Sequence, residues 1–122
     1  MITTKNGNEV GFPAGALLDL FGSVVWDAFG EPPFLVGSAC TSKAWRDVDV
    51  RLILRDEEFA AMFGSFPPPH GGKWAALCMA FSALGKQMTG LPVDFQIQQM
   101  TDANEKYDGP RHALGLIEAR RA

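Results

Sequence analysis

The segment from Asp47 to Leu54 limits the possible folds more than any other part of the chain. It is a short apolar run with Asp47 and Asp49 at its head, which predicts a β-strand. Side chains two residues apart lie on the same face of a strand, so we expect the two carboxylates to be neighbours. Like charges on one strand face repel each other unless a cation lies between them. A divalent metal ion would supply that cation.

A second acidic strand is predicted from Leu91 to Gln98, where apolar and polar residues alternate. This alternation places Asp94, Gln96 and Gln98 on one face. Three carboxylates, those of Asp47, Asp49 and Asp94, are therefore expected to converge from two strands.

The rest of the chain alternates between helical and strand patterns, with Gly and Pro at the boundaries. The predicted elements are a hairpin over 2–12 with its turn at Asn6-Gly7, a helix from Pro13 to Gly30, a strand over 34–36, a short helix or loop over 38–45, a helix over 56–63, an extended proline segment over 65–72 that is a candidate lid, and a helix from Trp74 to Gly90. After Met100 we expect a polar, turn-rich tail with weak helicity only near 116–119. This order predicts an α/β (α+β) fold with a small mixed β-sheet flanked by helices.

The composition excludes several classes of protein. With 122 residues, 47% of them apolar and 20% charged, the chain has the size of one folded domain covering residues 1–122. A net charge of −3 leaves no diffuse basic surface for nucleic acid or anionic membranes. The sequence contains no signal-peptide-like start and no apolar run of the ~20 residues that span a bilayer, so we expect a cytoplasmic protein.

The cysteines and histidines do not predict a zinc site. His70 and His112 are far apart in the sequence, and neither has a partner at zinc-ligand spacing. Without a secretion signal, Cys40 and Cys78 are expected to be reduced thiols.

The acidic strands also stand in a recognisable order. An apolar strand runs into Val36-Gly37-Ser38, eight residues follow, then come Asp47-Val48-Asp49 and, on a later strand, Val93-Asp94-Phe95. This order resembles the nucleotidyltransferase superfamily that includes DNA polymerase beta and kanamycin nucleotidyltransferase, and the match covers residues 15–98. The segment from Ala103 to Leu116 also looks like the tails of small nucleotidyltransferase-like proteins from bacteriophages.

The resemblance implies a role for each of these residues. Asp47 and Asp49 would hold two Mg²⁺ ions, for which Mn²⁺ can substitute, and Asp94 would bind the ion nearest the acceptor and help to deprotonate its hydroxyl. Gly37 and Ser38 would grip the β- and γ-phosphates of a nucleoside triphosphate.

Three further residues are candidates for nucleotide binding. Arg51 follows the acidic pair on the same strand face and would either contact the triphosphate or form an ion pair with Asp49. Tyr107 could stack on a base and Arg111 could bind phosphate through two hydrogen bonds, unless both lie in a surface tail.

The sequence therefore predicts an Mg²⁺-dependent nucleotidyltransferase that acts on an acceptor hydroxyl of a small molecule, a protein or an RNA end. An alternative is an inactive nucleotidyltransferase fold that binds nucleotide as an antitoxin, regulator or sensor beside a partner protein, because the chain has no room for an acceptor-binding domain. Glycosyltransferases also use Asp-x-Asp to hold Mn²⁺, but they need a larger sheet than 122 residues can build.

Overall fold

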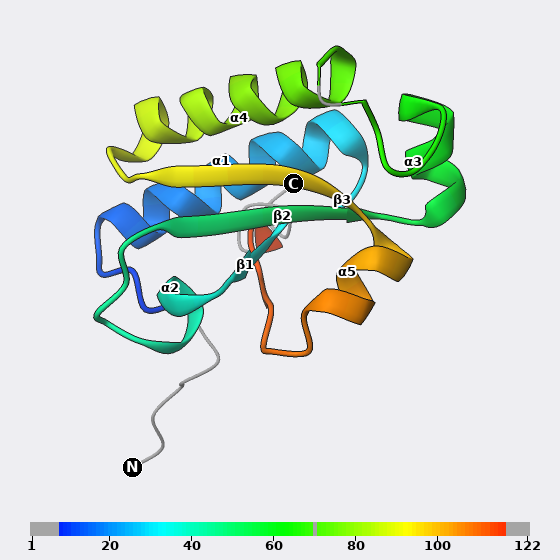
Figure 1. Ribbon diagram of the computed structural model, residues 1–122. Coiled ribbons are helices and arrows are strands. Elements are labelled where there is room, and N and C mark those ends of the chain that lie inside the picture. Colours follow the sequence, from blue (N-terminus) through cyan, green and yellow to red (C-terminus); the bar gives the residue numbers. More distant parts are fainter. Residues whose placement is uncertain (1–7, 70, 117–122) are drawn as a thin grey trace.

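The fold is built on a four-stranded mixed sheet. The computed structural model describes residues 8–69 and 71–116 (Figure 1). Within them the strands are β1 (Phe34–Val36), β2 (Val48–Leu54), β3 (Val93–Gln99) and β4 (His112–Ala113), in the order β3-β2-β1-β4. Strand β1 pairs antiparallel with β2 and with β4, whereas β2 and β3 are parallel. The predicted mixed sheet flanked by helices is confirmed.

Five described helices surround this sheet. They are α1 (Ala14–Phe29), α2 (Ser38–Thr41), α3 (Asp56–Phe63), α4 (Lys73–Thr89) and α5 (Met100–Lys106). Helices α1 and α4 pack together on one side of the sheet, and α5 lies on the other (Figure 1). Glycines in the left-handed region, Gly30 and Gly90, end α1 and α4 as the sequence predicts. None of these helices has the length and apolar composition needed to cross a membrane.

Alternation along β2 and β3 separates a core face from a mostly polar face, on which Ile53 is a buried apolar exception. Val48, Val50 and Leu52 of β2 are fully buried, and the ring of Phe95 in β3 packs edge-on against Phe21 of α1, with ring centroids 6.1 Å apart. The apolar stripe of α1 is narrower than predicted, because Leu17, Val24 and Ala28 are exposed. Side chains on the other face of β2 and β3 are therefore available for a site.

Strand β3 is an edge strand, and helix α4 covers its outer edge with side chains. The Ser82 hydroxyl accepts a hydrogen bond from the Phe95 amide (2.8 Å) and donates one to the Phe95 carbonyl (3.3 Å). The Trp74 indole donates to the Ile97 carbonyl (2.9 Å). These contacts satisfy backbone groups that would otherwise attract another strand.

The predicted N-terminal hairpin is wrong in its described half. Residues 1–7, which include the expected first strand and turn, lie outside the described residues. Residues 10–12 form no strand: Val10 is buried in the core, and the Gly11 carbonyl accepts from the Gly15 amide (2.8 Å). Gly11, followed by the fixed φ of Pro13, turns the chain into α1 instead.

The prediction of a largely irregular tail after Met100 is also wrong. Helix α5 begins where the Asp56 carboxylate accepts from the Thr101 amide (3.1 Å) and the Gln99 side chain accepts from the Asp102 amide (3.2 Å). Strand β4 then pairs with β1, and Leu114 is fully buried. Tertiary contacts therefore order a segment that lacks apolar periodicity. The weakly helical stretch predicted near 116–119 lies almost entirely outside the described residues.

A glycine in α1 tests the docking of this C-terminal segment. A Cβ on Gly22 would lie 2.4 Å from Leu114 Cβ, so we expect Gly22→Ala to lower the free energy of unfolding by about 1–3 kcal/mol, although alanine is the better helix former. Urea unfolding measures this effect. Gly11→Ala, which would meet no atom within 4 Å, is the matched control and should change stability by less than about 0.5 kcal/mol. Equal stability of both variants would show that Leu114 does not pack against α1.

Candidate functional site

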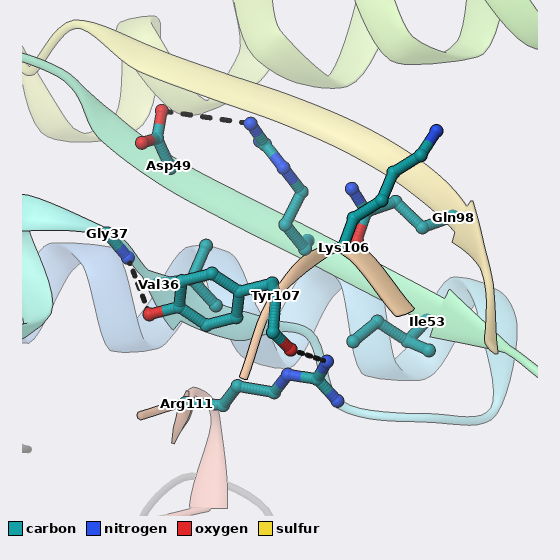
Figure 2. Close-up of a pocket in the computed structure, with 9 residues that line it drawn as sticks. Val36, Gly37, Asp49, Ile53, Gln98, Lys106, Tyr107 and Arg111 are labelled. Atoms are coloured by element: carbon teal, nitrogen blue, oxygen red, sulfur yellow. Dashed lines mark hydrogen bonds and ion pairs between the residues drawn. The ribbon is translucent and has the colours of Figure 1, made fainter. Parts of the chain in front are cut away.

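A pocket of about 260 Å³ opens on the polar face of the sheet, away from α1 and α4 (Figure 2). Strands β1, β2 and β3 form its floor, and the end of α5 with the loop that follows forms its wall. We call it the sheet pocket. Its lining residues are Val36, Gly37, Asp49, Arg51, Ile53, Gln98, Lys106, Tyr107 and Arg111. Five of the predicted site residues are among them, namely Gly37, Asp49, Arg51, Tyr107 and Arg111.

The register of the two parallel strands brings Asp49 and Asp94 together. Asp49 of β2 is the direct partner of Asp94 of β3, and directly paired residues lie on the same sheet face. Arg51 lies beside both, with Nη2 3.8 Å from Asp49 Oδ1 and 3.5 Å from Asp94 Oδ2. The ion pair with Asp49, one of the two alternatives for Arg51, is therefore present. A guanidinium thus lies between the carboxylates, where the sequence predicts a metal ion.

The Arg51 guanidinium forms shorter contacts with backbone carbonyls than with the two carboxylates. Its Nη1 donates to the Asp94 carbonyl (2.7 Å) and to the Val50 carbonyl (3.2 Å). Its side chain is only 14% exposed. The guanidinium is thus fixed across β2 and β3 independently of the two carboxylate contacts.

Asp49 has an unfavourable environment for its charge. Burial raises the pKa of Asp49 above its ordinary value, and the charges of Asp94 and Asp47 raise it further, while Arg51 lowers it. The Arg51 guanidinium thus contacts two carboxylates, those of Asp49 and Asp94, and the charge of Asp47 acts on Asp49 as well. The cluster carries a surplus of negative charge.

Asp47 does not lie where the sequence places it. It precedes the first residue of β2, is exposed and is not part of the pocket lining, whereas the prediction put it beside Asp49 on the strand face. The reason is that ladder pairing starts at Val48, which pairs with Val93, and the β1 ladder ends where Val36 meets Asp49. Asp47 has no ladder partner to hold it in the strand.

The acidic residues fit a divalent cation only in part. Among residues 8–69 and 71–116, no three His, Cys, Asp or Glu side chains gather closely enough to hold a metal ion. Asp49 and Asp94 nevertheless supply hard oxygen donors on one face, and Mg²⁺ commonly takes one or two carboxylates and completes its shell with water and substrate phosphate. The donor set and its surplus negative charge fit Mg²⁺ bound together with a phosphate ligand.

Of the two residues predicted to grip the phosphates, Gly37 lines the sheet pocket and Ser38 does not. Gly37 has φ 72°, and a Cβ there would lie 2.8 Å from Asp49 Oδ2, so glycine is needed for this close approach. Its amide points towards the Tyr107 hydroxyl in the sheet pocket (Figure 2). Ser38 is exposed at the start of α2 and does not line the pocket.

Tyr107 and Arg111 belong to the pocket wall rather than to a surface tail. The Tyr107 hydroxyl accepts from the Gly37 amide (3.3 Å), and the Arg111 guanidinium lies 5.8 Å from the centre of the Tyr107 ring. Lys106, which the sequence analysis missed, lines the same wall. It was not chosen as a site residue because α5 was not predicted, whereas Gln98 could have been found from the strand face that it shares with Asp94.

Asp94 also borders a second hollow. Its side chain is 49% exposed and helps to line a groove between β3 and α4 together with Trp74 and Lys86. The proline segment that was a candidate lid lines a different hollow, beside Trp74 and Phe63. Its function as a lid stays a prediction.

Comparisons with known proteins found no relative of this chain. No protein-family model matches it, and neither a curated protein nor a solved structure matches it. The functional argument therefore depends on the geometry of the sheet pocket.

The raised pKa of Asp49 predicts how stability depends on pH. Because the folded pKa exceeds the unfolded one, ionised Asp49 costs stability above the folded pKa, and this cost disappears as the pH falls towards about 4. Asp49→Asn should therefore raise the free energy of unfolding at pH 7.5, and the gain should vanish near pH 4. Urea unfolding at both pH values measures the effect. Asp108→Asn, at an exposed loop position, controls for the lost charge, and a less stable Asp49→Asn at pH 7.5 would contradict the electrostatic description.

Proposed function

We propose that this chain is an Mg²⁺-dependent nucleotidyltransferase that moves a nucleoside monophosphate from a nucleoside triphosphate to an acceptor hydroxyl in the cytoplasm and releases pyrophosphate. The observation that supports this most is the direct pairing of Asp49 with Asp94 beside the Gly37 turn, at a pocket with basic side chains in its lining. The order of strand, Gly-Ser turn, Asp-x-Asp strand and third acidic strand supports the same reaction.

The sheet pocket offers a triphosphate several complementary groups. Arg51, Lys106 and Arg111 bring positive charge to its lining, and the Gly37 amide is a backbone donor of the kind that binds phosphate oxygens. The Tyr107 ring lines the same wall and offers an aromatic face to a base. These basic side chains favour a phosphorylated ligand over a neutral one.

The carboxylates would serve the reacting phosphate. Asp49 and Asp94 would hold Mg²⁺, which when bound stabilises the attacking and leaving oxygens of an in-line displacement. Asp94 also faces the groove along α4, so its exposed carboxylate is open to an acceptor hydroxyl approaching from that side and would accept its proton. Asp49, beside Gly37, would remain on the triphosphate side.

A second candidate function is nucleotide binding without transfer, as in an antitoxin, regulator or sensor that works beside a partner protein. One observation favours it: Arg51 already forms ion pairs with Asp49 and Asp94, which supplies part of the positive charge that catalysis would take from metal ions. Binding is common to both candidates, and transfer separates them.

Metal-dependent binding can be measured with Mn²⁺ and a non-hydrolysable triphosphate by NMR line broadening. We expect Asp49→Asn to weaken the binding of the metal–nucleotide complex by at least about tenfold, because one of two carboxylate ligands is lost. Asp27→Asn, which removes an exposed carboxylate from α1 on the opposite side of the sheet, should bind like the wild type. Equal binding by the wild type and Asp49→Asn would remove the proposal.

Transfer can be measured with a triphosphate labelled on the α-phosphate and a panel of small-molecule, protein and RNA acceptors. Under the leading proposal, label moves to an acceptor only when Mg²⁺ or Mn²⁺ is present, and Asp94→Ala abolishes the transfer while Asp27→Asn retains it. Triphosphate binding without transfer to any member of the panel would instead support the binding function.

A further inference from the structure

The Tyr107 hydroxyl is hydrogen-bonded to the Gly37 amide, the backbone donor that a phosphate would need. It accepts a hydrogen bond from the Gly37 amide (3.3 Å) and donates one to the Pro110 carbonyl (2.8 Å), as Figure 2 shows for the contact with Gly37. An amide has a single N–H, so Gly37 cannot donate fully to the hydroxyl and to a phosphate oxygen at the same time. The two acceptors must compete.

The segment that carries this hydroxyl is folded back on itself. We call residues 107–111 the tyrosine strap; it connects α5 to β4. Arg111 closes it by donating to the Tyr107 carbonyl (3.2 Å) and the Asn104 side chain (3.0 Å). Gly109 lies so close to the Tyr107 ring that a Cβ there would be 2.6 Å from the hydroxyl oxygen. The strap thus holds the ring against Gly37 without help from a ligand.

We propose that Tyr107 is a built-in competitor for phosphate: its hydroxyl takes the Gly37 amide in the free protein, and a triphosphate displaces it and opens the tyrosine strap. This inference depends on the proposed triphosphate site. A phosphate oxygen is charged and forms the stronger hydrogen bond, so it wins the amide when present. The longer contact with Gly37 breaks first, and the hydroxyl then leaves the Pro110 carbonyl for water as the strap opens.

The competition makes the strap a sensor of phosphate and not of the nucleoside. A base or ribose alone has no anionic oxygen to offer the Gly37 amide, so a nucleoside leaves the hydroxyl in place. The strap ends at β4, the edge strand that pairs with β1. Its opening therefore changes the conformation at this edge of the sheet. Occupancy of the sheet pocket is thereby linked to the conformation of the C-terminal segment.

Tyr107 is the one tyrosine in the sequence, which allows a direct measurement. Protein labelled with 3-fluorotyrosine should give a single ¹⁹F NMR resonance. Inorganic tripolyphosphate and ATP, each with Mg²⁺, should shift this resonance towards its position in the unfolded chain, whereas adenosine should leave it unchanged. A resonance that stays in place when ATP binding is saturated would overturn the competition.

Removing the hydroxyl alone provides the second test. Tyr107→Phe keeps the ring, so ATP should bind about fivefold more tightly, since one hydrogen bond no longer has to be displaced. In the free protein the Gly37 amide should exchange with solvent faster in Tyr107→Phe than in the wild type. Thr41→Val is the matched control, because the Thr41 hydroxyl donates to the Gly37 carbonyl (3.5 Å) and not to the competing amide; it should leave both measurements unchanged.

The outcomes separate this inference from the proposed function. If the wild type binds ATP but Tyr107→Phe binds it no more tightly, the competition is overturned and the triphosphate site stands. If Gly37 exchange is the same in the wild type and Tyr107→Phe, the contact itself is overturned. If the wild type binds neither ATP nor tripolyphosphate, the proposed function fails and the competition fails with it.

Discussion

The pairing of β2 with β3 decides where the charged groups of this protein lie. Its register is set on the other side of the sheet, where alternate residues of both strands, such as Val50 and Phe95, are buried in the core. A shift by one residue would expose this apolar set, so the register cannot relax to separate the acids. Asp49 and Asp94 are therefore forced to be neighbours on strands about 4.8 Å apart. Like charges on neighbouring positions of one sheet face repel each other.

Arg51 offsets this repulsion because the same alternation puts it on the same face, two residues after Asp49. Its side chain reaches the carboxylates of both strands and the Asp94 carbonyl. Packing of the hydrophobic core thus brings two carboxylates together on the polar face, and Arg51 partly neutralises their charge. Asp49 still keeps a raised pKa, first because it is partly buried and then because Asp94 and Asp47 repel its charge.

Local periodicity explains how much of this could be predicted from the sequence. The helices α1 and α4 and the strands β2 and β3 are long enough for a repeat of 3.6 or 2 residues to appear, and their glycine ends are local signals as well. The strand repeat also fixed which side chains share the face of Asp94. The pairing of Asp49 with Asp94 needed one further assumption, that the two acidic strands are adjacent and in register.

The missed elements are those stabilised by distant parts of the chain. Helix α5 has seven residues and a polar sequence, and its first turn depends on Asp56, 45 residues away. Strand β4 has two residues and exists through its pairing with β1. Lys106 was not chosen as a pocket residue because α5, which positions it, was not predicted. Asp47 was misplaced for the same kind of reason, because the end of a ladder is set by the partner strand and not by the residue itself.

Whether Arg51 and a metal ion can share the acidic face depends on what holds the guanidinium. Its shortest hydrogen bond, 2.7 Å, goes to the Asp94 carbonyl, while its distances to the Asp49 and Asp94 carboxylates are 3.8 and 3.5 Å. A backbone-anchored guanidinium keeps its position when the carboxylates turn to another partner. Contacts at these distances leave oxygen lone pairs of both carboxylates free, and the arrival of a triphosphate would add negative charge that favours a second cation. Under the proposed function, Arg51 and Mg²⁺ would therefore be complementary occupants of this face: Arg51 holds the two acids together in the free protein, and Mg²⁺ would bind together with the phosphates.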